Sequence, residues 1–133
     1  MILKSKLLWF IILFLGVMLI GLGCQHDTAG PKDLLNKYFS SAIKQDYATT
    51  YTCYYDAYKA KVSREEYIRH RKEASVLLSH KIISIKMLKS DLAEAEVQLT
   101  FGPSEKLKRK EPATITVKED LIKEKGEWRI KVW

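Results

Sequence analysis

Few residues in this chain are of types that could carry catalysis or bind a metal. Its 133 residues include three histidines and two cysteines. His26 stands alone in a short polar segment and His70 lies in a charged stretch, so both are expected to be exposed. His80 has no histidine, cysteine or acid beside it at metal-ligand spacing. We therefore expect neither a metal site nor a cofactor.

Cys53 and Asp56 are the remaining candidates for nucleophilic or acid–base catalysis. Cys53 lies among tyrosines with no recognisable base nearby, which is typical of a buried, inert thiol. Asp56 follows a tyrosine in a helical pattern and is expected to face solvent. No catalytic residue is predicted.

Five tyrosines occur between residues 47 and 58 at helical spacing. They can form a core with their hydroxyls at its rim, or they can line a ligand pocket, because aromatic rings with polar tips suit both roles. Both interpretations remain open. If a pocket exists, its expected lining residues are Tyr51, Tyr55, Phe101 and Trp128.

A basic patch is predicted at Lys106, Lys108, Arg109 and Lys110, four cations within five positions. The whole chain has a net charge of +7, of which +5 remains when Lys4 and Lys6 are set aside. Such a charge favours anionic neighbours. The patch is either a solvated loop or a contact with an anionic envelope polymer or a membrane.

A basic and then apolar leader opens the chain. Two lysines in the first six residues precede an uncharged run of seventeen residues, 7–23. This is the pattern of an export signal, and the run also reaches the minimum of about 17 residues for a spanning helix. Since no Lys or Arg follows until Lys32, the positive-inside rule places the remainder outside the cytosol. Nucleic acid is thereby excluded as a partner.

Cys24 is the candidate for lipid attachment. The segment GLGC, residues 21–24, resembles a bacterial lipobox, in which a cysteine thiol receives diacylglycerol before cleavage. Gly23 fits the position before the cysteine, whereas the leucine lies one residue nearer to it than usual. The resemblance implies a lipoprotein signal peptide over 1–23, a tether over 24–30 and a domain over 31–133, on the extracytoplasmic face of the cell membrane. An uncleaved anchor is the alternative.

Three helices are predicted after the leader. Apolar residues recur at helical spacing over 31–45, with proline at the first position. The tyrosines over 46–58 predict a second helix, and a capping box at Ser63 and Glu66 opens a third over 64–76. The expected inward positions of the third helix and its continuation are Tyr67, Ile68, Arg71, Ala74 and Leu78.

About four antiparallel strands follow. Residues 82–88 are rich in β-branched side chains, 93–101 alternate between apolar and polar, and 113–123 and 127–133 flank a tight turn at Lys125 and Gly126. The expected inward residues are Ala93, Ala95, Val97, Leu99, Phe101, Ile115, Val117, Trp128 and Ile130. None of these can exchange a proton, which argues against acid–base catalysis.

Three segments carry a resemblance to a known family: KQDY at 44–47, VSREEYIRHRKE at 62–73 and KEDLIKEKGEWRIKVW at 118–133. With the order of elements, they resemble NTF2-like domains, particularly the small domain that precedes the transpeptidase module in some penicillin-binding proteins and similar stand-alone lipoproteins. The resemblance implies an α+β cone in which three helices pack on a curved antiparallel sheet.

NTF2-like enzymes typically place an Asp, or an Asp and a His, inside the cone. An apolar interior therefore favours a non-catalytic binding or accessory module in the cell envelope. A small-molecule lyase or isomerase that uses the cone as its pocket is the alternative. Besides the membrane, an envelope protein or an anionic polymer is the expected partner. A homodimer is also open, because NTF2-like domains often pair through their sheets.

Overall fold

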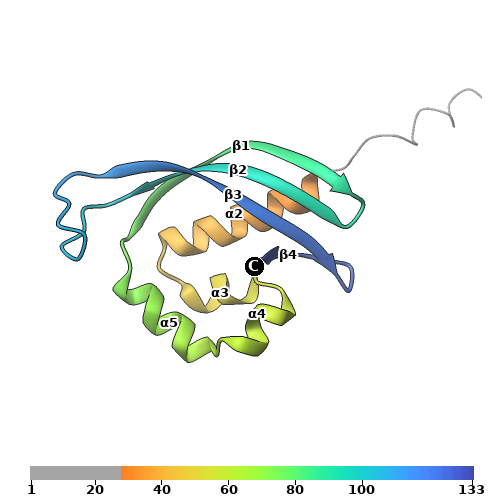
Figure 1. Ribbon diagram of the computed structural model, residues 1–133, viewed down its shortest axis with the longest axis horizontal. Coiled ribbons are helices and arrows are strands. Elements are labelled where there is room, and N and C mark those ends of the chain that lie inside the picture. The colour runs from red at the N-terminus through yellow and green to blue at the C-terminus, as the bar shows by residue number, and fades with distance from the viewer. Residues whose placement is uncertain (1–27) are drawn as a thin grey trace, which may run out of the picture.

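A curved four-stranded antiparallel sheet arches over four helices in the computed structural model, which describes residues 28–133 (Figure 1). The strands are β1 (Leu77–Lys89), β2 (Leu92–Phe101), β3 (Ala113–Glu124) and β4 (Glu127–Lys131), in that spatial order. The predicted α+β class is confirmed. The leader and Cys24 lie outside the described residues. Within 28–133, no helix has the length and apolar character needed to cross a membrane.

Helix α2 (Ala29–Ile43) lies directly beneath the sheet and supplies much of the core (Figure 1). It begins two residues before the predicted start. Its apolar positions recur every three or four residues, so one face is buried. The buried residues of this face are Pro31, Leu34, Leu35, Tyr38, Phe39 and Ala42. They pack against β2, β3 and β4 residues of the same core cluster, including Val97, Leu121 and Ile130.

The predicted second helix is two helices, α3 (Tyr47–Thr52) and α4 (Asp56–Lys61), so the prediction of one continuous helix is wrong. Asp46 caps α3 as expected, accepting a hydrogen bond from the Thr49 amide at 3.2 Å. The break occurs because the chain at 53–55 pairs with β4. The Ile130 amide donates to the Cys53 carbonyl at 2.8 Å, and the Tyr55 amide donates to the Ile130 carbonyl at 3.0 Å. These backbone bonds replace those of a continuous helix.

Helix α5 (Arg64–Glu73) begins at the predicted cap, where the Ser63 hydroxyl accepts a hydrogen bond from the Glu66 amide at 3.2 Å. It ends before the predicted Val76, because the chain turns extended at Ala74 and β1 begins at Leu77. Leu78, expected on an inward helical face, lies instead on β1 with 48% of its surface exposed.

The sheet register places one apolar face against the helices. On β2 the residues Ala93, Ala95, Val97 and Leu99 are all buried, as the alternation predicts. The β3–β4 hairpin turns at Lys125 and Gly126, whose φ values of 50° and 81° suit a tight two-residue hairpin turn. At the other end, β2 and β3 extend beyond the helices (Figure 1, left). Ile115, expected in the core, is therefore 47% exposed.

Candidate functional site at the open end of the sheet

The principal candidate site is a pocket of about 390 Å³ where β2 and β3 extend past α5. We call it the mouth pocket. Its walls come from the C-terminal end of α5, the ends of β2 and β3, and the loop over 102–112 between those strands. The charged lining residues are Arg71, Glu73, Lys106 and Arg109, and the large apolar ones are Phe101, Leu107 and Ile115. A volume of this size suits a small organic ligand.

The loop that closes the mouth pocket has a defined conformation. Ser104 and Arg109 exchange two backbone hydrogen bonds of 2.9 Å, which close a tight turn over 105–108. The Arg109 guanidinium donates to the carbonyls of Gly102 at 2.5 Å and Glu111 at 3.0 Å. Arg109 therefore holds the two arms of the loop together. Lys106 and Leu107 sit at the tip of the turn, where 64% of Leu107 is exposed.

The predicted basic patch is divided between two hollows of this loop. Lys106 and Arg109 line the mouth pocket. Lys108, Arg109 and Lys110 line a second hollow of about 720 Å³ on the loop. The four cations therefore surround one short turn, and in the described residues none of the four forms an ion pair with an acid.

Arg71 is the most enclosed cation of the mouth pocket. Its guanidinium lies over the Tyr47 ring, 5.6 Å from the ring centroid. Its Nε is buried and has no hydrogen-bond partner among residues 28–133. A buried donor without an acceptor costs about 1 to 3 kcal/mol, more when it is charged. Arg71 was predicted only as an inward helical position, because sequence could not show that no acid would pair with it.

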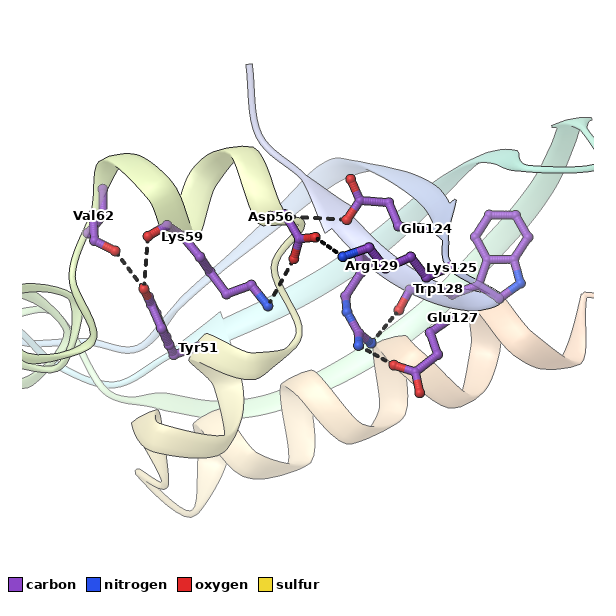
Figure 2. A network of polar contacts seen from close by, with 9 residues as sticks. All are labelled: Tyr51, Asp56, Lys59, Val62, Glu124, Lys125, Glu127, Trp128 and Arg129. Carbon is purple, nitrogen blue, oxygen red and sulfur yellow. Dashed lines mark hydrogen bonds and ion pairs between the residues drawn. The ribbon is translucent and has the colours of Figure 1, made fainter.

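Of the four residues predicted to line a pocket, only Phe101 does so in this site. Tyr51 instead donates to the Val62 carbonyl at 2.7 Å, tying α3 to the end of α4. Tyr55 donates to the Val132 carbonyl at 2.5 Å. Trp128 packs at the edge of the core, and Figure 2 shows it and Tyr51 at opposite ends of the view. Helical spacing could not separate these structural tyrosines from ligand contacts.

A cluster of aromatic rings joins α2, α4 and α5. The Tyr38 and Tyr54 hydroxyls are 2.7 Å apart, and Tyr67 donates to the Thr50 hydroxyl at 2.8 Å. Burial raises the pKa of both Tyr38 and Tyr54, so these phenols stay neutral. Tyr58 packs against Tyr54 with tilted rings, 4.6 Å between centroids. The cluster is chiefly core, which is the first of the two interpretations offered by the sequence.

Glu119 overturns the expectation of an inward sheet face without ionisable groups. It pairs with Ala95 in the β2–β3 register and shares the inward face of Val117 and Leu121. Burial, with a smaller effect from the neighbouring Asp120, raises the pKa of its carboxyl to about 7. No side chain among residues 28–133 forms a hydrogen bond or ion pair with it. Glu119 continues the alternation of Ile115 and Val117 along β3, which is the signal in the sequence for its inward position.

The other candidate residues have structural surroundings. Asp56 is exposed between Lys125 and Lys59, at 3.4 and 3.5 Å (Figure 2). The Lys125 contact, with a smaller effect from Lys59, lowers its pKa. Cys53 is 1% exposed, which confirms the prediction that it is buried, and burial raises the pKa of its thiol.

The two described histidines do not form a metal site. His80 stacks on Phe39 and lies 3.3 Å from the Asn36 amide oxygen, and burial lowers its pKa. His70 is exposed, 3.8 Å from Glu66. Among residues 28–133, no group of three or more His, Cys, Asp or Glu is arranged to hold a metal ion.

Solved structures support the NTF2-like assignment of the fold. A SEC-C motif-containing protein from Rhodopseudomonas palustris is similar over 80% of this chain and 79% of its own, with a TM-score of 0.62 and 13% identity. An NTF-2 like protein of unknown function from Shewanella oneidensis aligns over 77% and 93%, with a TM-score of 0.55 and 15% identity.

A Campylobacter jejuni protein described as an NTF2-like transpeptidase aligns over 79% of this chain and 100% of its own, with a TM-score of 0.54 and 15% identity. No family model matches the sequence, and no curated protein sequence matches it either. The chain thus has the NTF2-like fold that its sequence predicted.

Proposed function

We propose that this NTF2-like domain is a non-catalytic binding module, carried on the outer face of a bacterial cell membrane by a lipid on Cys24 or by its apolar leader. Its binding surface is the mouth pocket together with the loop over 102–112, which carries Lys106, Lys108, Arg109 and Lys110 and is called the basic loop below. Its partner is an anionic component of the envelope. The leader and the lipobox-like segment support the location.

One observation carries the binding role. Four cations are presented on a loop that is already folded by Arg109 and the Ser104–Arg109 backbone pair, beside a pocket with apolar walls. A loop ordered before binding loses less conformational entropy when a partner is bound. Unpaired surface cations also attract polyanions through screened, salt-sensitive forces.

The test uses the full chain in phosphatidylcholine nanodiscs, mixed with cell-wall sacculi that retain their anionic polymers. Wild type should co-sediment with sacculi at about 50 mM salt and be released near 0.5 M salt. Changing Lys106, Lys108, Arg109 and Lys110 to Ser should abolish co-sedimentation. The matched control changes four exposed lysines elsewhere, Lys32, Lys81, Lys86 and Lys89, to Ser. If both variants lost co-sedimentation equally, binding would depend on net charge alone, which would contradict a role for the loop.

Glu119 favours the second candidate function, a small-molecule enzyme. A carboxyl whose pKa lies near neutral pH is suited to general acid–base catalysis, and such groups cluster at active sites. Glu119 lines neither the mouth pocket nor the second hollow on the loop over 102–112, however. In a strain lacking the protein, folded Glu119→Gln should restore function as wild type does. Failure of that variant, with normal abundance and envelope binding, would favour the enzyme.

A further inference from the structure

The mouth pocket is lined by both cationic and apolar side chains. A single ligand contacts both kinds only if it is amphipathic. Arg71, Lys106 and Arg109 place three cations in its lining, against one acid, Glu73. Phe101, Leu107 and Ile115 provide apolar surface beside them. A purely polyanionic partner would leave this apolar surface unused, and an apolar one would leave the cations unpaired.

Arg71 gives the strongest indication of the chemistry of the ligand's head group. Its buried Nε has no acceptor, and no acid pairs with its guanidinium within the described part of the chain. The guanidinium lies over the Tyr47 ring. Guanidinium groups bind carboxylate and phosphate oxygens through paired N–H donors. An oxyanion in the pocket would accept hydrogen bonds from the guanidinium Nη groups of Arg71, which form no hydrogen bond or ion pair within the described part of the chain.

The apolar residues indicate the rest of the ligand. Leu107 and Ile115 are 64% and 47% exposed and lie on the same pocket as Arg71, and Phe101 joins them from the end of β2. Covering exposed apolar surface contributes about 25 cal/mol per Å². A short hydrocarbon or aromatic group attached to the oxyanion would cover these side chains while its head reaches Arg71 and Lys106.

We propose that the mouth pocket binds a small amphipathic anion, with a carboxylate or phosphate head on Arg71, Lys106 and Arg109 and an apolar body on Phe101, Leu107 and Ile115. This inference rests on the proposed binding function and names the ligand class of its pocket. The head chemistry is shared by organic acids and phosphate monoesters, and the experiment separates them.

Equilibrium dialysis on the full chain in phosphatidylcholine nanodiscs provides the test, with empty nanodiscs as background. The probes are radiolabelled 3-phenylpropionate and phenyl phosphate. The comparison compounds are 3-phenylpropanol, which lacks the charge, and acetate and inorganic phosphate, which lack the apolar body. Saturable binding of at least one aromatic anion is expected, at least about tenfold tighter than any comparison compound. The tighter of the two aromatic anions identifies the head group.

Variants locate the site. Arg71→Gln with Lys106→Gln should weaken probe binding at least about tenfold. Its matched control, Lys108→Gln with Lys110→Gln, removes the same charge from the same loop outside the mouth pocket and should change binding less than about twofold. Leu107→Ser should weaken binding about threefold or more, whereas Leu88→Ser should not, because Leu88, which is 51% exposed, lies at the far end of β1. If the Arg71→Gln variant does not fold, the Lys106→Gln and Leu107→Ser variants still test whether the mouth pocket is the binding site.

Two results would overturn the ligand class: no saturable binding of either probe to a folded chain, or equal weakening by the test and control variants. Sacculus binding that persists in either case would leave the proposed binding module standing, so the two failures are distinguishable. Tight binding of phenyl phosphate and inorganic phosphate alike would show a simple anion site and contradict the amphipathic proposal.

Discussion

Gly30 and Trp128 are in such close contact that a Cβ on residue 30 would lie 2.5 Å from Cδ1 of the indole. This contact joins the first turn of α2 to β4, two elements at opposite ends of the described chain. Glycine is required here for close approach rather than for an unusual backbone angle.

We expect Gly30→Ala to lower the free energy of unfolding by about 1 to 3 kcal/mol, because the methyl group must displace the indole. Trp128→Ala should cost about 2 to 4 kcal/mol, somewhat less than a fully buried ring, because Trp128 is only partly buried. In the Trp128→Ala background, Gly30→Ala should be neutral or slightly stabilising, because alanine favours helix. Urea unfolding of the four proteins measures this coupling, and strictly additive effects would contradict the contact.

Because the pKa of Glu119 is raised in the folded state, we expect the free energy of unfolding to fall as pH rises. Below about pH 4.5 its carboxyl is protonated in both the folded and unfolded states, and above about pH 7 it is ionised in both. Between these values the folded state holds the proton more tightly, so the stabilising effect of this group is lost as pH increases. The loss should be about 2 to 3 kcal/mol between pH 4 and pH 8.

Glu119→Gln should remove this component. In urea unfolding, the free energy of unfolding of the variant should equal that of wild type at pH 4 and exceed it by about 2 kcal/mol at pH 8. Glu96→Gln, on the outer face of the same sheet, is the control and should leave the pH dependence unchanged. A Glu119→Gln variant that is less stable than wild type at pH 8 would show that the ionised carboxyl has a favourable partner.

Cys24 is expected to be the acylated first residue of the mature protein. Mass spectrometry of the membrane fraction should detect an N-terminal peptide that begins at Cys24 and carries a diacylglycerol adduct. Cys24→Ser should block both processing and acylation while leaving the domain folded. A mature chain that begins at Met1 with a free Cys24 thiol would show that Cys24 is not lipidated and that the leader is an uncleaved anchor.

The sequence was informative where one periodic signal dominated. The apolar face of α2, the caps at Asp46 and Ser63, the alternation of β2 and the Lys125–Gly126 turn are all local patterns, and each is present in the structure. The break between α3 and α4 was not predictable in this way. It depends on hydrogen bonds from residues 53–55 to Ile130, more than seventy positions away.

The candidate site was predicted only in fragments. Phe101, Lys106 and Arg109 had been named, but for separate reasons, as pocket lining and as basic patch. Their convergence with Arg71 requires β2 and β3 to extend beyond the helices and α5 to end beneath them, which is a tertiary relationship. Glu119, by contrast, falls on the inward alternation of β3 between Val117 and Leu121, but its sequence neighbours Lys118 and Asp120 give it the appearance of an exposed charged run.

Photo-crosslinking in living cells tests the central claim, that the mouth pocket and basic loop form the binding surface, most directly. Benzoylphenylalanine would be placed at position 107, on the loop tip, and in a second strain at position 88, at the far end of β1. A discrete envelope adduct is expected from position 107, and it should disappear when Lys106, Lys108, Arg109 and Lys110 are changed to Ser. No such adduct is expected from position 88. Adducts from position 88 with none from position 107 would contradict it.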